Sequence, residues 1–193
     1  MKLGDTDQIY RNRKSHQGVS LVIVLIFLAI LSGLAITAIQ SSTYSSRIAG
    51  NESDRTLAFQ AAEAALRDAE YDINNVIADG TTPCSTATPV CRADPIYRGN
   101  GFDTTCPLGR CIPNSLSPVW EISSNWDASS TKSVSYGTYT GATALPVVSR
   151  QPRYMLEYFS INGYAVYRVT AVGFGANDTT RAYLQTSVKA KPV

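Results

Sequence analysis

An uninterrupted apolar run near the start constrains this chain more than any other feature. Residues 19–39 read VSLVIVLIFLAILSGLAITAI, and no aspartate, glutamate, lysine or arginine occurs between Lys14 and Arg47. A helix of this length, rising ~1.5 Å per residue, would be roughly 31 Å long, which matches the hydrocarbon core of a bilayer. We therefore expect residues 19–39 to form a transmembrane helix, and the chain beyond it to form one domain.

The charges on either side of this run predict its orientation. Residues 1–18 carry four basic and two acidic side chains, whereas the rest of the chain carries 13 of each sign. Basic residues beside a span stay in the cytoplasm, so the chain after it should lie on the outer side of the membrane. An outer domain without net charge gives no electrostatic reason to bind nucleic acid.

Four cysteines lie beyond the run and predict two disulfides, because thiols oxidise outside the cytoplasm. They allow three pairings, of which short separations and flanking turn residues favour Cys84 with Cys91 and Cys106 with Cys111. Zinc binding is the alternative. It fits less well because the CxxxxxxC and CxxxxC spacings match zinc sites poorly and no histidine follows.

A helical pattern continues past the apolar run. Residues 55–77 are rich in alanine, leucine, glutamate and arginine, which favour helices, and no proline occurs between residues 19 and 78. Apolar residues recur every three or four positions and would share one helix face: Phe59, Ala62, Leu66, Ala69, Ile73 and Val76. We interpret the acidic residues of the same segment as solvated surface charge: Asp68, Glu70 and Asp72. An amphipathic helix over residues 40–79 should thus continue the span.

We expect this helix to end near Asp79 and Gly80, since Gly80 and then Pro83 stop it. Residues 80–149 should form a disulfide-containing loop region, because they hold all four cysteines and many glycines, prolines and serines. Within it, Trp120 and Trp126 are expected to anchor the core.

Residues 150–193 should form a C-terminal antiparallel sheet. The runs 154–160, 164–174 and 181–188 are rich in β-branched and aromatic residues, and Asn162 with Gly163 is a hairpin-turn pair. One face of this meander should pack on the apolar stripe of the helix. The fold class would then be α+β, with two layers.

Residues 14–18, KSHQG, stand directly before the apolar run and resemble the leader of a type IV prepilin. In that family a prepilin peptidase cuts after the glycine, and the new N-terminus is methylated. The resemblance implies a leader of residues 1–18, cleavage between Gly18 and Val19, and N-methylation of Val19. An uncleaved signal anchor is the alternative. A cleaved secretory signal fits less well, because the run exceeds the usual h-region and no A-x-A site follows.

Further blocks resemble the PilX minor pilins, and they occur in the same order. They are 47–51 (RIAGN), 57–70 (LAFQAAEAALRDAE), 106–111 (CPLGRC) with 118–120 (PVW), 151–154 (QPRY) with 157–158 (EY), and 167–177 (YRVTAVGFGAN) with 183–186 (YLQT). The resemblance implies a pilin-like fold, with a long N-terminal helix packed on an antiparallel β-meander. It also implies a minor pilin that assembles with other minor pilins in the inner membrane and primes or caps a type IV pilus, which supports adhesion and twitching motility.

The chain departs from the pilin pattern at Ile23. Most pilins carry a glutamate at this fifth position after the cleavage point, where it meets the methylated amine of a neighbouring subunit. A charge in the bilayer is costly without such a partner. In lacking it, the chain resembles tip-type GspK pseudopilins and some PilX proteins, so we expect a place at the pilus tip. Tolerance of variation at this position is the alternative.

No catalytic set is evident, since the one histidine, His16, lies in the leader. We expect no enzymatic activity, cofactor, metal or small-molecule substrate. The expected partners are other minor pilins, the major pilin, the prepilin peptidase and inner-membrane lipid. Two other functions stay open: a GspK-type minor pseudopilin of a type II secretion system, and an uncleaved, membrane-anchored periplasmic binding domain.

Overall fold

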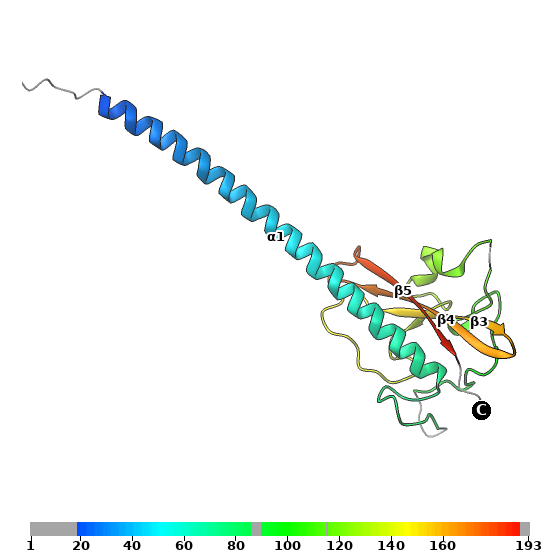
Figure 1. Cartoon of the computed structure of the whole chain (residues 1–193). Coiled ribbons are helices and arrows are strands. Elements are labelled where there is room, and N and C mark those ends of the chain that lie inside the picture. The colour runs from blue at the N-terminus through cyan, green and yellow to red at the C-terminus, as the bar shows by residue number, and fades with distance from the viewer. Residues whose placement is uncertain (1–18, 86–89, 115, 190–193) are drawn as a thin grey trace, which may run out of the picture. The chain divides into compact units, whose positions relative to one another are not determined.

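The computed structural model describes residues 19–85, 90–114 and 116–189, which form two compact units (Figure 1). The first unit ends at residue 48. Its described part is residues 19–48, which we call the helical unit. The second, residues 49–193, is called the head. Helix α1, Val19–Ile73, contributes to both units. The expected leader lies outside the described residues.

The helical unit consists of the first part of α1, and none of its side chains is buried. Its valine, leucine, isoleucine and phenylalanine side chains are all exposed. Three hydroxyls on this segment donate to carbonyl oxygens three or four residues earlier, so they are satisfied within the helix: Ser32, Thr37 and Thr43. Among the described helices, α1 is long and apolar enough to cross a membrane.

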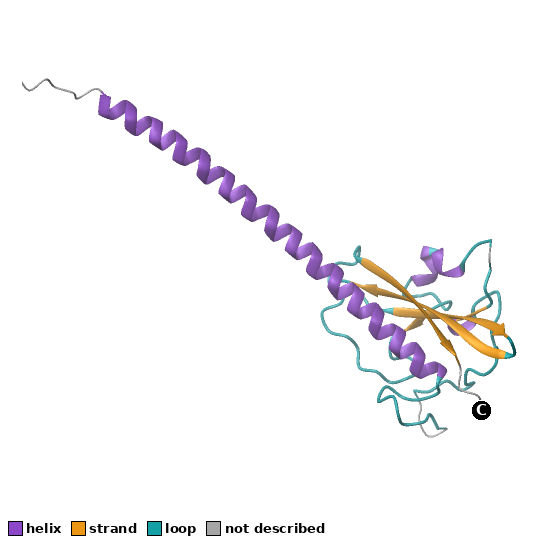
Figure 2. Cartoon of the chain, viewed as in Figure 1, coloured by secondary structure: helices purple, strands orange, loops and turns teal. Residues whose placement is uncertain are grey.

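The head contains a five-stranded sheet in the order β1-β3-β4-β5, with β2 paired to β3 (Figure 2). The strands are β1 Arg110–Cys111, β2 Val134–Ser135, β3 Arg153–Ile161, β4 Tyr164–Phe174 and β5 Arg181–Lys189. Strands β3, β4 and β5 form an antiparallel meander, while β1 runs parallel to β3. Asn162 and Gly163 join β3 to β4, and both have positive φ angles, as a type I′ turn requires.

Between α1 and the meander, the chain forms loops, three short 3₁₀ helices and the two-residue strands β1 and β2. The 3₁₀ helices are η1 Pro107–Gly109, η2 Val119–Glu121 and η3 Ser123–Trp126. Strand β2 pairs antiparallel with the start of β3. The α+β fold class is therefore confirmed, with a pilin-like helix followed by loops and an antiparallel meander.

Both faces of the meander are covered. On one face lies the head part of α1, whose alanines are buried: Ala58, Ala61, Ala62, Ala65 and Ala69. The opposite face packs against the loop region, in a cluster of Cys106, Cys111, Trp126, Met155, Val172 and Phe174. The head thus has a layer of loops in addition to the two layers expected, and Trp126 anchors it as the sequence predicted.

The helix face that meets the sheet differs from the predicted stripe. Phe59 is 46% exposed and Leu66 only half-buried, whereas Ala62, Ala69 and Ile73 are buried as expected. A side chain on Gly173 of β4 would collide with the backbone of Ala58 and Ala62, so helix and sheet are almost in backbone contact. Only alanine fits at this distance, and the larger side chains are displaced to the flank.

The helix also ends earlier than expected, at Ile73 instead of near Asp79. Asn75 adopts a positive φ of 54° and donates its N–H to the Asp72 carbonyl, while the Val76 N–H reaches the Tyr71 carbonyl. These two bonds form a Schellman motif with asparagine at its left-handed position. Val76 then pairs with Pro83 outside the helix, so it is not part of the helical stripe.

Candidate assembly surfaces and the polar centre of the head

The membrane-segment residues singled out from the sequence lie at the start of α1. Val19 is its first described residue, and Gly18 lies outside the described part of the chain. Ile23 falls in the second turn, with its side chain 48% exposed among other exposed aliphatic side chains. Residues 19–46 carry no charged side chain, so the contacts of this surface with lipid or with other helices involve no side-chain charge.

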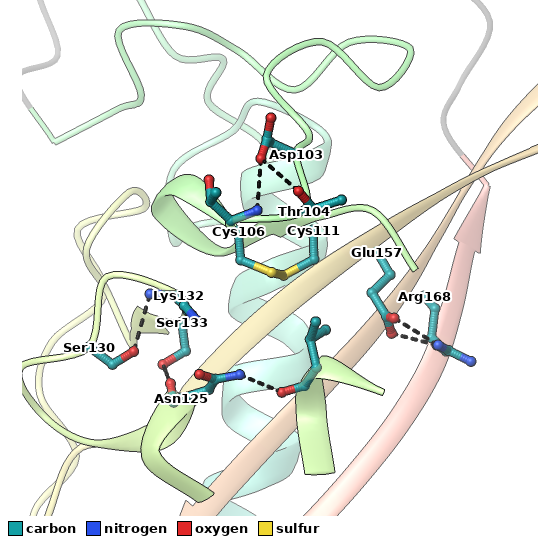
Figure 3. The surroundings of a disulfide bond; sticks show 12 residues. Asp103, Thr104, Cys106, Cys111, Asn125, Ser130, Lys132, Ser133, Glu157 and Arg168 are labelled. Carbon is teal, nitrogen blue, oxygen red and sulfur yellow. Dashed lines mark hydrogen bonds and ion pairs between the residues drawn. A yellow bond between two sulfur atoms is a disulfide. The ribbon is translucent and has the colours of Figure 1, made fainter. Parts of the chain in front are cut away.

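The four cysteines form two disulfides, Cys84–Cys91 and Cys106–Cys111, which is the pairing that their separations favour. Both cysteines of the first are half-buried, and this disulfide lies after the end of α1. The second is buried on the sheet face opposite α1 (Figure 3), where Cys111 of β1 lies beside Glu157 of β3. Each bond therefore closes a short loop of the head.

A buried ion pair links α1 to the first of these loops. Both carboxylate oxygens of Asp72 accept from Nε of Arg92, at 2.8 and 2.9 Å, and the Tyr154 hydroxyl donates to the same carboxylate at 2.7 Å. All three side chains are buried. Burial, together with the negative charge of Asp72, raises the pKa of Tyr154, so its hydroxyl stays protonated as a donor.

Arg92 extends this contact to two more segments. Its Nη2 donates to the Leu108 carbonyl at 3.1 Å, and its guanidinium lies 3.8 Å from the ring centre of Tyr139. Because Arg92 follows Cys91 directly, the Cys84–Cys91 disulfide holds the backbone that presents it. Arg92 thus joins the end of α1 to η1 and to the loop that carries Tyr139, and Asp72 links it to Tyr154 of β3.

A second buried carboxylate lies one helical turn earlier. Asp68 accepts a short hydrogen bond from the Thr140 hydroxyl and a 2.8 Å bond from the Gly137 N–H. Burial raises the pKa of Asp68 to about 6, although both hydrogen bonds act in the opposite direction. The two aspartates therefore fasten α1 to segments that lie far along the chain.

The burial of Asp68 and Asp72 corrects the expectation that they are solvated surface charge; only Glu70 of that group is exposed. A signal for them exists in the sequence. Asp68 and Asp72 are four residues apart and follow Ala61 and Ala65 at helical spacing, so they share the face of the alanine stripe.

Another buried carboxylate lies on the far face of the sheet (Figure 3). Glu157 of β3 pairs with Arg168 directly across on β4, with both oxygens bonded at 2.7 and 2.8 Å. Nearby, Arg153 donates to the hydroxyl and carbonyl of Ser133. The bonds of Arg153 hold the loop layer against the sheet, and the pair of Glu157 and Arg168 joins β3 to β4.

The head also has a groove of about 730 Å³ between the end of α1, residues 95–98 and the β3–β4 hairpin. Its lining includes Arg67, Tyr97, Arg98 and Tyr164, with Glu70 as its acidic side chain. The described residues include no histidine and no group of three or more potential metal ligands. The polar groups of the head are thus arranged to hold its parts together.

Comparison with models of known protein families identifies the family of this chain. The model for the PilX N-terminal region matches residues 17–67, and that for the C-terminal region of the type IV pilus assembly protein PilX matches residues 79–190. The chain belongs to the PilX family. Neither a curated protein nor a solved structure matches it significantly.

Membership of the PilX family gives the two units a common role, in the assembly of type IV pili. This is a structural role and not that of an enzyme family. The exposed apolar helix and the PilX match together indicate that the chain is anchored in a membrane. The PilX matches fall on either side of residues 68–78, where α1 ends and the loop region begins.

Proposed function

We propose that this PilX-family chain is a minor pilin that assembles with other minor pilins in the inner membrane and primes or caps a type IV pilus. The observation that carries the proposal is a helical unit without a single buried side chain, in a chain matched by PilX models over both units. An apolar helix of this kind is stable either in lipid or packed against the helices of other subunits. Priming a pilus would move this helix from lipid to a position against the helices of other subunits.

The same proposal includes topology and processing. The basic residues before the span favour a cytoplasmic N-terminus and a periplasmic head, where the disulfides of the head can form. Prepilin peptidase would cut between Gly18 and Val19, and Val19 would be methylated. Mass spectrometry of the mature protein tests this, and Gly18→Trp should block the cut. Mature wild-type protein that still carries residues 1–18 would contradict it.

The proposal is tested most directly by counting pili. A strain that lacks this chain should show far fewer surface pili, and twitching motility and adhesion should fall with them. The full chain should restore the pili, whereas a secreted head without residues 19–39 should not, because it cannot join a helical bundle. An unchanged number of pili in the deletion strain would overturn the priming role.

Placement at the tip rests on Ile23. A subunit with nothing above it needs no carboxylate for a neighbour's amine, so Ile23→Glu would only add a cost of roughly 2.5–3.5 kcal/mol for an acid in the bilayer. Ile26→Glu is the matched control, since Ile26 is similarly exposed less than one turn further along α1. At the tip, both variants should reduce the amount of the subunit in sheared pili. An increase with Ile23→Glu alone would place the chain inside the shaft.

A further inference from the structure

Strand β5 forms an open edge of the sheet in the head. It pairs with β4 through nine consecutive residue pairs, from Val166 with Lys189 to Phe174 with Arg181. Among the described residues, no backbone group outside β4 bonds to β5, and none of its nine residues is buried. The N–H and C=O groups that face away from β4 are therefore available to another strand.

Edge strands are usually protected against such pairing by proline, a bulge, charged side chains or a covering segment. Strand β5 contains no proline, its register with β4 has no bulge, and the residues 182–188 between its ends are uncharged. The opposite side of the sheet differs, because β1 and β2 pair with the outer edge of β3. Among the described residues, protection on the β5 side is thus limited to the two terminal charges, Arg181 and Lys189.

The ends of β5 determine what kind of strand fits. Arg181 and Lys189 form no ion pair with a described carboxylate; instead each cation lies over an aromatic ring, of Phe174 and Tyr164 respectively. Two copies of β5 paired antiparallel about Gln185 would place Arg181 opposite Lys189 twice. Parallel pairing in register would place each cation opposite itself. Like charges directly across a ladder are destabilising, so a second copy is a poor occupant.

We propose that β5 is an acceptor edge for an extended strand of another protein, which carries acidic residues opposite Arg181 and Lys189 and uncharged residues between them. Backbone hydrogen bonds would supply affinity, and the two terminal charge pairs would set register and specificity. That this strand belongs to another pilus subunit rests on the proposed function, whereas the acceptor edge itself does not.

The test uses the full chain in detergent micelles and two synthetic nine-residue peptides. Both alternate threonine and valine over the seven central positions, and they end in glutamate or in lysine. The glutamate-ended peptide should bind about tenfold more tightly, because two opposite-charge pairs replace two like-charge pairs. Hydrogen exchange should then slow at alternate amides of β5, those that face away from β4.

A charge reversal makes the test specific. The double variant Arg181→Glu with Lys189→Glu should prefer the lysine-ended peptide by a similar factor. Lys132→Glu, at an exposed position outside the strands, should leave the original preference unchanged. Equal binding of both peptides, or binding without slower exchange in β5, would overturn the acceptor edge. Neither result bears on the pilus count, which tests the minor-pilin role separately.

Discussion

A β-carbon on Gly173 would lie 2.0 Å from the carbonyl oxygen of Ala58. This one relationship explains why alanines line the part of α1 that meets β4, and why glycine stands near the end of that strand. It also brings the helix close enough for Asp68 to accept a hydrogen bond from the Gly137 N–H and for Asp72 to accept one from the Tyr154 hydroxyl.

Gly173→Ala should therefore destabilise the head, because the added methyl must push helix and sheet apart. We expect the free energy of unfolding to fall by about 1–3 kcal/mol. Urea unfolding of the full chain in micelles, followed by the fluorescence of buried Trp126, measures the loss. Gly50→Ala is the control. Its β-carbon would meet nothing within 4 Å, so it should stabilise α1 by up to about 1 kcal/mol. A neutral Gly173→Ala would contradict the close contact.

The raised pKa of Asp68 makes the stability of the head depend on pH. The pKa is about 6 in the folded head, above the usual 3.8, so the folded state holds the proton more tightly. This contribution is fully present below about pH 4 and is lost as the pH rises through 6, by up to about 3 kcal/mol.

Asp68→Asn isolates this effect, since the amide is neutral at every pH and can still accept from Gly137. Relative to the variant, the wild-type chain should lose stability between pH 4 and pH 7. A difference between wild type and Asp68→Asn that stays constant across this range would rule out the raised pKa.

The buried pair of Asp72 and Arg92 should show strong coupling. Arg92→Leu leaves a buried carboxylate without its cation and should cost about 3–5 kcal/mol. Adding Asp72→Asn should recover part of that loss, because the amide oxygen still accepts from the Tyr154 hydroxyl without carrying a charge. Unfolding free energies of the two single variants and the double variant give the coupling energy. Purely additive effects would mean that the pair does not act as a unit.

The two disulfides should differ in their reaction with reductant. Cys84 and Cys91 are half-buried, whereas Cys106 and Cys111 lie in the core cluster with Trp126. Dithiothreitol should open Cys84–Cys91 in the folded head and open Cys106–Cys111 only on unfolding. Alkylation followed by mass spectrometry reports the order, and simultaneous reduction would contradict it. Each bond closes a short loop and should contribute about 2–3 kcal/mol.

Features with a local physical cause could be predicted from the sequence. The apolar run from residue 19 specifies a helix because length and absence of charge are properties of the segment itself. The three strands and the turn at Asn162 and Gly163 follow from β-branched side chains and a required positive φ. The end of α1 at Ile73, followed by the left-handed Asn75, is also local, but glycine and proline further along were the stronger signals in the sequence.

Other features were decided only by the tertiary structure. Periodicity places Phe59 and Ala62 on the same side of the helix, but it does not show which of them faces the sheet. The small distance between Gly173 and the helix backbone decides this, because it leaves room only for alanine. Likewise, the charge of Asp68 and Asp72 predicts exposure. They can be buried because Thr140 and Tyr154 donate hydrogen bonds to them. These two partners lie more than 70 residues away along the chain. A sequence lists such donors, and only the packed fold brings them within hydrogen-bonding distance.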